Sequence, residues 1–405
     1  MKILTFSTLF PNAEKPGHGI FVENRLRHLV ASGQVEARVV APVPWFPSAH
    51  PRFGNWARMA KVARKEVRHG LQVAHPRYPT LPKIGMNVAP ALLAQAVRPT
   101  VARLIDEGFD FDLIDAHYFY PDGVAAAMLG RYFNKPLAIT ARGSDISLLP
   151  RYRLPRRMIQ WAARRADAVI TVCDALRDEV IELGVPPAHV TSLRNGVDLD
   201  LFRPMERTPN KDFTLVSVGH LVPVKAQELI VAALPLLPGV RLVLAGDGPN
   251  RKMLEQLADE LKLRERVTFL GALPQAALRE HYARADAMVL ASSREGWANV
   301  LLESMACGTP VVASRVYGTP EVVAAPEAGV LMQERTPQGV ADAVNALRAN
   351  YPDRGATRRY AERFSWDDTT AGQLRIFGDV LARRRAHHAG AVATQAPATP
   401  GLRKR

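Results

Sequence analysis

The feature that most limits how this chain can fold is a repeated alternation of short β-branched runs with longer amphipathic stretches, arranged in two series. The first series predicts strands over residues 2–7, 35–41, 112–116, 136–140 and 167–172. The second predicts strands over 213–218, 240–245, 266–270, 286–290 and 310–313, and helices over 226–236, 250–261, 274–283 and 298–306. Strands that alternate with helices form parallel sheets with helices on both faces. We therefore expect an α/β protein with two doubly wound, Rossmann-like domains.

A segment rich in turn residues, 196–211, separates the two series and predicts a linker. It leaves a first domain over residues 1–195 and a second over 212–365. Ligands of doubly wound folds bind beyond the carboxyl ends of the strands, so two such domains facing each other form a cleft. A helix is expected over 366–385, and the tail 386–405, rich in Ala, Pro, Thr and basic residues, is expected to be disordered.

The composition is that of a globular protein with an excess of positive charge. Of 405 residues, 47% are hydrophobic and 23% are charged, and no apolar run approaches the roughly 18 residues of a membrane span. The first residues predict a strand and not a signal peptide, so a cytoplasmic location is the expectation. Cys173 and Cys307 lie in apolar contexts, which predicts reduced core residues. The net charge of +14 favours phosphorylated ligands, nucleic acid or an anionic membrane surface as partners.

Two glutamates, Glu295 and Glu303, lie eight positions apart on either side of a predicted helix start. Gly296 allows the backbone to pass close to a ligand. Free N–H groups at the start of a helix bind anions, and residues 299–301 carry them here. Two incidental glutamates beside a buried helix are the alternative interpretation. Together the segment predicts a phosphate cradle with two acceptors for hydroxyl groups, which suits a nucleotide sugar.

This segment resembles the Glu-x7-Glu motif of the retaining family-4 glycosyltransferases, which have the GT-B fold. In that family the first glutamate contacts the hydroxyls of the donor sugar and the second holds the ribose. Val218–Lys225 is similar to the family's Gly-Arg-Leu…Lys-Gly segment, whose cationic side chains grip the donor diphosphate. Lys225 matches the family's lysine, Gly219 allows the tight turn, and His220 stands where the family often has arginine. A solvated surface lysine is the alternative for Lys225.

Two further turns of the second domain resemble family signatures. Gly246-Asp247-Gly248 ends a strand, and the resemblance places it near the nucleotide; turn chemistry explains Asp247 equally well. Gly318-Thr319-Pro320-Glu321 resembles the family's Gly-Gly-x-Pro-Glu turn, with Tyr317 in place of the first glycine.

In the first domain, the loop around Gly19 resembles the family's Gly-rich loop, which lies near the donor phosphates and the acceptor. The loop lacks the dinucleotide fingerprint G-x-G-x-x-G, because Val22 occupies the third glycine position. A nicotinamide-dependent oxidoreductase is therefore disfavoured.

Two predicted strands of the first domain end in polar residues that point to the cleft. A lone histidine such as His117 is more often structural, but it resembles the histidine that lies beside the donor sugar in this family. Arg142-Gly143-Ser144-Asp145 resembles the family's His-Gly-x-Asp loop, with Arg142 in the place of the histidine. The added charge of Arg142 is expected to meet an anionic acceptor or the departing phosphate.

Two basic clusters lie in the first domain. The first is expected on one helical stretch and comprises Arg52, Arg58, Lys61, Arg64, Lys65 and Arg68. The second comprises Arg151, Arg153, Arg156, Arg157, Arg164 and Arg165. Solvated helix faces are the default interpretation of such runs. Our functional interpretation is peripheral binding to an anionic inner membrane surface, with interleaved apolar side chains entering the interface: Trp56, Met59, Met158 and Trp161.

No metal site is expected. Asp110-x-Asp112 and Asp198-x-Asp200 are spaced like the metal-holding pair of GT-A enzymes, but neither belongs to a second cluster of ligands. We therefore expect no metal and no cofactor beyond the nucleotide-sugar co-substrate.

The resemblance covers nearly the whole chain and is strongest to the bacterial branch that builds surface polysaccharides of the teichuronic-acid kind. It implies transfer of a sugar, with retention, from a UDP-sugar to a hydroxyl of a saccharide or lipid-linked acceptor. The catalytic residues it implies are His117, Lys225 and Glu295. The donor-binding residues it implies are Gly19, Arg142, Asp145, Gly219, His220, Asp247, Gly296, Asn299, Val300, Leu301 and Glu303. A nucleotide-sugar epimerase, an inactive nucleotide-sugar-binding protein and a nucleic-acid-binding module are the alternatives; no recognised nucleic-acid motif supports the last.

Overall fold

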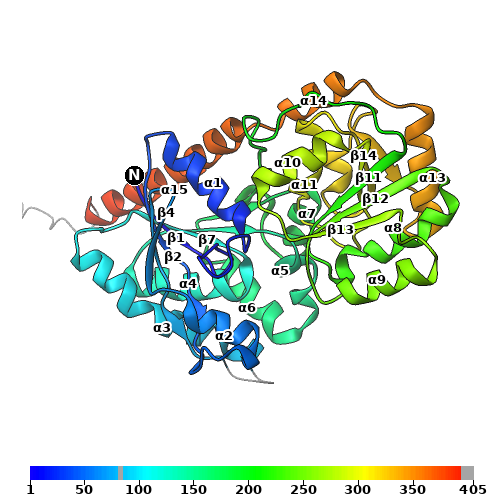
Figure 1. Ribbon diagram of the computed structural model, residues 1–405. Coiled ribbons are helices and arrows are strands. Elements are labelled where there is room, and N and C mark those ends of the chain that lie inside the picture. Colours follow the sequence, from blue (N-terminus) through cyan, green and yellow to red (C-terminus); the bar gives the residue numbers. More distant parts are fainter. Residues whose placement is uncertain (81–84, 394–405) are drawn as a thin grey trace, which may run out of the picture.

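The computed structural model describes residues 1–80 and 85–393, and it consists of two α/β units joined side by side (Figure 1). Each unit contains one large sheet with helices on both faces. The predicted α/β class with two doubly wound sheets is confirmed.

The first sheet has eight strands in the order β10-β9-β8-β7-β1-β2-β5-β4. All neighbours pair in parallel except β4, which pairs with β5 in the antiparallel sense. The strands are β1 (Lys2–Phe6), β2 (Glu36–Val40), β4 (Lys65–Arg68), β5 (Leu71–Ala74), β7 (Leu113–His117), β8 (Leu137–Ala141), β9 (Ala168–Thr171) and β10 (Val190–Ser192). A separate pair joins β3 (Val43–Pro44) and β6 (Arg77–Tyr78). The helices are α1 (Ile20–Ala31), α2 (Asn55–Lys61), α3 (Gly85–Asp106), α4 (Val124–Phe133), α5 (Ser144–Ser147), α6 (Arg153–Ala163) and α7 (Asp174–Glu182).

The second sheet has six parallel strands in the order β13-β12-β11-β14-β15-β16. The strands are β11 (Phe213–Val218), β12 (Val240–Ala245), β13 (Val267–Gly271), β14 (Ala287–Leu290), β15 (Val311–Ser314) and β16 (Gly329–Met332). The helices are α8 (Gln227–Ala233), α9 (Arg251–Glu260), α10 (Gln275–Arg284), α11 (Asn299–Ala306), α12 (Thr319–Val322), α13 (Pro337–Ala349) and α14 (Arg354–Glu362). Two of these strands, β11 and β12, have the bounds that the sequence predicts.

Each sheet reverses its strand order once, between β1 and β7 in the first unit and between β11 and β14 in the second. At such a switch point the loops from two neighbouring strands turn to opposite faces and leave a crevice. The loops after these four strands therefore hold the positions at which a doubly wound fold binds its ligand.

The two faces of the first sheet bury different apolar sets, because side chains along a strand alternate between faces. On one face Ile3 packs with Leu26 of α1. On the other face Leu4 and Phe6 pack with Val97 of α3. Cys173 and Cys307 are free and buried, as predicted.

The last helix, α15 (Trp366–Ala393), runs back from the second unit onto the first and lies along α1 (Figure 1). Its residues Phe377 and Val380 are buried in the same apolar cluster as Leu26 of α1. The predicted return crossing is confirmed. The predicted disorder is wrong for residues 386–393, which continue the helix; four of these eight residues are alanine, the strongest helix former. The remainder of that prediction, 394–405, lies outside the described residues.

The first basic cluster does not lie on one helix, so that prediction is wrong. Residues 51–53 form a short 3₁₀ turn, α2 ends at Lys61 and the chain then enters β4. Extended backbone at Val62 ends α2, and pairing with β5 favours the strand. In the part of the chain that is described, no helix is long and apolar enough to cross a membrane.

Candidate functional site

The two strands that flank the second switch point each deliver one charged side chain to the same place. Lys225 ends a short 3₁₀ turn after β11, and Glu295 lies in the loop after β14. The Lys225 Nζ donates to Glu295 Oε1 at 2.5 Å, and the two side chains are 23% and 11% exposed. The Ser293 N–H donates to the Val224 carbonyl at 2.8 Å and fixes one loop against the other. The structure thus brings these two predicted residues together.

The start of α11 offers fewer free N–H groups than predicted. No side chain caps the helix at Ala298. The N–H of Asn299 donates to the Trp297 carbonyl at 3.1 Å, and the N–H of Leu301 donates to the Ala298 carbonyl at 3.0 Å. An anion bound at this helix start would therefore have to displace the local hydrogen bonds of the Asn299 and Leu301 N–H groups. The Val300 N–H makes neither of these bonds.

Glu303 lies one turn further along α11 and is buried. Its carboxylate accepts from the Tyr282 hydroxyl at 3.0 Å and from Gln275 Nε2 at 3.1 Å. Burial raises the pKa of Glu303 to about 7, while these two hydrogen bonds oppose the rise. The neutral and the charged forms of the Glu303 carboxyl group therefore have similar populations near neutral pH.

Gly219, His220 and Asp247 lie at the ends of β11 and β12, beside Lys225. Gly219 has φ +148°, and a Cβ at this position would lie 3.8 Å from the Lys225 side chain. His220 is exposed, and its Nδ1 lies 3.3 Å from the Asp247 carbonyl oxygen. Asp247 accepts from the next N–H, of Gly248, at 2.8 Å, which is ordinary turn chemistry.

At the first switch point, His117 ends β7 and is buried. Its Nδ1 accepts from Arg142 Nη2 at 2.8 Å, because a guanidinium has donors only. Its Nε2 must then carry the proton, which it directs at Asp115 Oδ2 at 3.1 Å. Burial lowers the pKa of His117 to about 4, so the ring is neutral. Both ring nitrogens are engaged, and the predicted sugar contact would require one of these partners to withdraw.

Arg142 does not present its charge to the cleft as expected. Its guanidinium is buried, donates to His117 and to Asn195 Oδ1 at 3.0 Å, and lies over the Phe21 ring at 5.3 Å. Asp145 is also turned inward. It accepts from the N–H groups of Phe119 and Gly143, both at 2.7 Å, and thereby shapes its own loop.

Gly19 immediately precedes α1 with φ +70°, and a Cβ there would lie 2.3 Å from the Leu9 carbonyl oxygen. The position therefore requires glycine for the path of the loop itself.

A buried polar network that was not predicted from the sequence lies behind His117. Arg25 of α1 donates to Gln373 of α15 at 3.0 Å and to Asn195 Oδ1 at 3.3 Å. Gln373 donates in turn to Asp115 at 3.2 Å, and Asn195 donates to Asn299 Oδ1 at 3.3 Å. The network therefore ties both units, the connection between them and α15 to the first switch point. A signal in the sequence is a charged residue, Arg25, next to the apolar positions Val22, Leu26 and Leu29.

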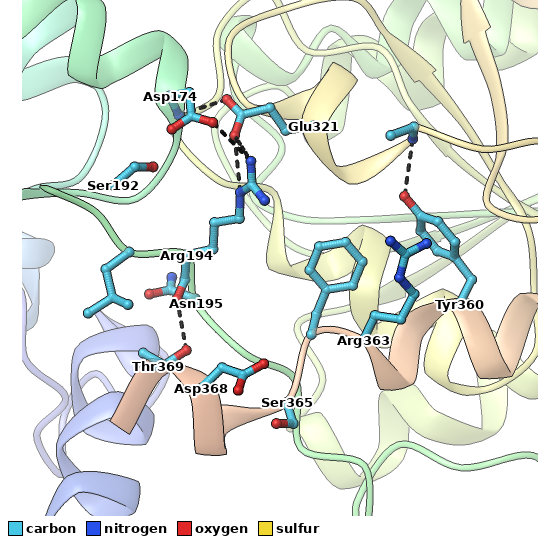
Figure 2. Close-up of a pocket in the computed structure, with 13 residues that line it drawn as sticks. Asp174, Ser192, Arg194, Asn195, Glu321, Tyr360, Arg363, Ser365, Asp368 and Thr369 are labelled. Carbon is cyan, nitrogen blue, oxygen red and sulfur yellow. Dashed lines mark hydrogen bonds and ion pairs between the residues drawn. The ribbon is translucent and has the colours of Figure 1, made fainter. Parts of the chain in front are cut away.

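A cavity of about 600 Å³ lies on the far side of this network, and Asn195 forms part of its wall (Figure 2). Its walls include Asp174 of α7, Arg194, Glu321, Tyr360 of α14 and Thr369 of α15. Because Lys225, Glu295 and Glu303 do not line it, this cavity is not the predicted donor site. Among the described residues, no three His, Cys, Asp or Glu side chains group as a metal site would require.

Comparison with known proteins gives matches over both units. Residues 17–201 match the model described as "Glycosyltransferase Family 4", and residues 200–364 match that of "Glycosyl transferases group 1". The D-inositol 3-phosphate glycosyltransferases of Mycobacterium tuberculosis H37Rv and of Mycobacterium bovis AF2122/97 are 35% identical to this chain over 251 residues. The match covers 56% of this chain and 52% of each relative, so the chain spans about half the length of the curated relatives it matches.

Solved structures share the whole architecture at low sequence identity. Sucrose-phosphate synthase from Thermosynechococcus elongatus superposes with a TM-score of 0.78 at 20% identity, over 94% of this chain and 99% of that one. Anabaena Alr3699/HepE in complex with UDP superposes with a TM-score of 0.69 at 22% identity, over 94% and 100%. These likenesses confirm the predicted GT-B arrangement of the two units.

Proposed function

The chain joins a family 4 glycosyltransferase domain to a group 1 glycosyltransferase domain in the GT-B fold, and from this premise we propose that it is a retaining glycosyltransferase. It transfers a sugar from a nucleotide donor, a UDP-sugar, to a hydroxyl group of a saccharide or lipid-linked acceptor, in the synthesis of surface polysaccharide or glycolipid. Neighbours of the same fold were solved with UDP and with UDP-glucose, which supports the choice of donor. The observation that carries the proposal is the pairing of Lys225 with Glu295 at the second switch point.

Lys225 supplies the positive charge for the donor diphosphate. Its ammonium has three donors, and one of them is held by Glu295 at 2.5 Å, so the other two are directed by that contact. The side chain retains 23% exposure, which leaves it a route to a ligand. A cation held in place before the reaction stabilises the negative charge that grows on the departing diphosphate without having to reorganise.

Glu295 orients the sugar. One of its oxygens is held by Lys225, and the other is left to accept hydrogen bonds from sugar hydroxyls. The donor sugar and its diphosphate would then contact two partners that already contact each other. The positions of the reacting bond and of the charge that leaves it are thereby coupled.

Glu303 receives the ribose in this proposal. Its ionised carboxylate can accept from both ribose hydroxyls, whereas its protonated form loses part of that capacity. Because burial raises its pKa to about 7, the ribose contact is expected to strengthen as the pH rises through neutrality.

The proposed reaction breaks the bond between the anomeric carbon and the diphosphate oxygen, and forms a bond from the acceptor oxygen to the same face of that carbon. The acceptor's proton passes to the departing phosphate oxygen. Lys225 stabilises that phosphate, and no side chain of the first unit has to act as the base. His117 and Arg142 contribute to the framework of the site through their mutual hydrogen bond and take no part in the proton transfer.

The second basic cluster is the part of the surface that best fits an anionic membrane. Arg153, Arg156 and Arg157 of α6 are exposed, beside Tyr152 and Leu154, which are 49% and 42% exposed. Basic side chains near an anionic surface contribute about 1 kcal/mol each. Of the apolar side chains expected to enter the interface, Met59 is buried, so that expectation is wrong for it.

The membrane proposal is tested by cosedimentation with vesicles. We expect binding to vesicles that contain anionic lipid and none to neutral vesicles, with loss of binding when Arg153, Arg156 and Arg157 are all changed to Gln. Equal binding by this triple variant would overturn it.

The function itself is tested by a thermal-shift screen against UDP, GDP, ADP and their sugars, with and without a divalent cation. We expect stabilisation by UDP and UDP-sugars that does not depend on the cation. The stabilising sugar then enters a transfer assay, in which the anomeric configuration of the product is determined by NMR. Stabilisation by another base alone would overturn the choice of UDP. Inversion would overturn the retaining mechanism, and no stabilisation by any of them would overturn the function.

A further inference from the structure

The segment Tyr317–Glu321 belongs to the second unit, but its side chains reach the first. It follows β15 and forms the start of α12. The proposed donor site makes no use of it.

Gly318 packs against Gly296 and Cys173 without room for a side chain of its own. A Cβ on Gly318 would lie 2.4 Å from the Gly296 carbonyl oxygen and 2.9 Å from the Cys173 Cβ. A Cβ on Gly296 would itself lie 1.9 Å from the Arg142 carbonyl oxygen. Gly296 therefore permits contact between the two units, where the sequence had indicated contact with a ligand. The loop that carries Glu295 is thus enclosed between Tyr317–Glu321 and the first unit.

Both carboxylate oxygens of Glu321 accept hydrogen bonds from the first unit (Figure 2). Its Oε1 accepts from the N–H groups of Asp174 and Ala175, at 2.8 and 3.2 Å. These N–H groups begin α7, so a carboxylate of one unit caps a helix of the other. Its Oε2 accepts from Arg194 Nε and Nη2, at 3.1 and 2.8 Å. Arg194 also pairs with Asp174 at 3.0 Å.

Tyr317 occupies a backbone conformation that favours glycine, with φ +44°. A glycine would avoid this strain, but it would have no side chain. The tyrosine side chain lies near Ser147 of α5 and Glu179 of α7, both in the first unit. The strained position is therefore occupied by a residue whose side chain spans the boundary between the units.

The cavity of about 600 Å³ lies beside these contacts (Figure 2). Arg194 crosses its edge to reach Asp174 and Glu321. Polar contacts of Arg194 and Glu321 therefore join the two units along the edge of this cavity.

We propose that Tyr317–Glu321 is an interdomain clamp, in which Tyr317 and Glu321 are positioning residues that hold the Glu295 loop against the first unit in the arrangement that transfers sugar. The proposal rests on the proposed function for its kinetic consequences. The claim that these residues hold the two units together does not depend on the reaction. The clamp and the proposed function can therefore fail separately.

The first test is hydrogen exchange of the Asp174 and Ala175 amides in the full chain without ligand. We expect faster exchange in Glu321→Ala and near-normal exchange in Glu321→Gln, whose amide oxygen still accepts. Glu327→Ala removes an exposed carboxylate from the same unit and should change nothing. Unchanged exchange in Glu321→Ala would overturn the clamp, whatever the protein catalyses.

The second test is kinetic. We expect kcat/KM for the UDP-sugar to fall about tenfold in Glu321→Ala, the loss typical of charge-assisted hydrogen bonds, and to stay normal in Glu327→Ala. Tyr317→Gly should have a melting temperature no lower than that of the parent, because its backbone strain is relieved, and should still lose activity. Tyr317→Phe should lose part of the activity. Normal kcat/KM in both Glu321→Ala and Tyr317→Gly would overturn the positioning role. A parent protein without transferase activity would count against the proposed function and leave the exchange result to decide the clamp.

Discussion

The two switch points of this molecule carry polar residues in opposite states. At the first, Asp115, His117 and Arg142 are buried and bonded to one another. At the second, Lys225 and Glu295 form one contact and remain partly exposed. A group whose hydrogen bonds are made within the protein supports a site, whereas a group with bonds to spare can bind a ligand. We therefore propose that the first cluster is framework and that the second is the donor site.

The largest expected effect is on folding, from Arg142→Met. It leaves His117 and Asn195 without their buried donor, and removing one partner of a buried charged network costs about 3–5 kcal/mol. Lys225→Met removes a single contact of a partly exposed pair and should cost less, about 1–3 kcal/mol. Urea unfolding followed by tryptophan fluorescence compares them. Equal losses in the two variants would break the distinction between framework and donor site.

The next effect is on catalysis, from Glu295→Ala. We expect the transfer rate to fall about 10²–10³-fold, the loss typical of a preorganised polar contact, while the fold is kept. Glu260→Ala removes an exposed carboxylate at the end of α9 and serves as the matched control. Full activity in Glu295→Ala would remove this residue from the site.

A smaller effect concerns pH and Glu303. Its folded pKa of about 7 lies above the ordinary value of 4.5, so burial favours the protonated form. The stability that protonation gives is complete below the ordinary pKa and is lost as the pH rises through about 7. Donor binding requires the charged form, so affinity for a UDP-sugar should rise about tenfold from pH 6 to pH 8. Calorimetric titration of the parent and of Glu303→Gln tests this, since the variant should lose the dependence on pH. An equal dependence in both would assign it to another group.

The smallest expected effect concerns His220, at the border of the proposed donor site. His220 is exposed beside Lys225, in the position where the family often has arginine. His220→Arg adds a permanent charge near the expected diphosphate, and an exposed ion pair contributes about 0.2–1 kcal/mol. Donor affinity should therefore improve severalfold at most, as measured by the same titration. Weaker binding would show that the histidine makes a contact that arginine cannot replace.

The sequence was sufficient for the fold and for the second switch point, because both depend on local patterns. Strands such as β11 and β12 are apolar runs bounded by turn residues, and their bounds are visible without a structure. Lys225 and Glu295 each follow such a strand, so their convergence follows from the strand order of a doubly wound sheet.

The first switch point could not be predicted in the same way, because its contacts join distant parts of the chain. Arg25 and Gln373 are 348 positions apart and meet only because α15 returns to α1. The type of residue at 142 was visible, but the direction of its side chain depends on Asn195 and His117. Similarly, the sequence predicts a helical stretch where β4 forms, because the pairing of β4 with β5 is not visible in the sequence.

The most direct test of the account is the affinity of UDP for the parent protein and for Lys225→Ala, measured side by side by calorimetry at low salt and without a divalent cation. The account predicts that the parent binds UDP and that the variant, still folded, binds at least about tenfold more weakly. Equal affinity in the two proteins would place the diphosphate elsewhere and would contradict the assignment of the donor site to the second switch point.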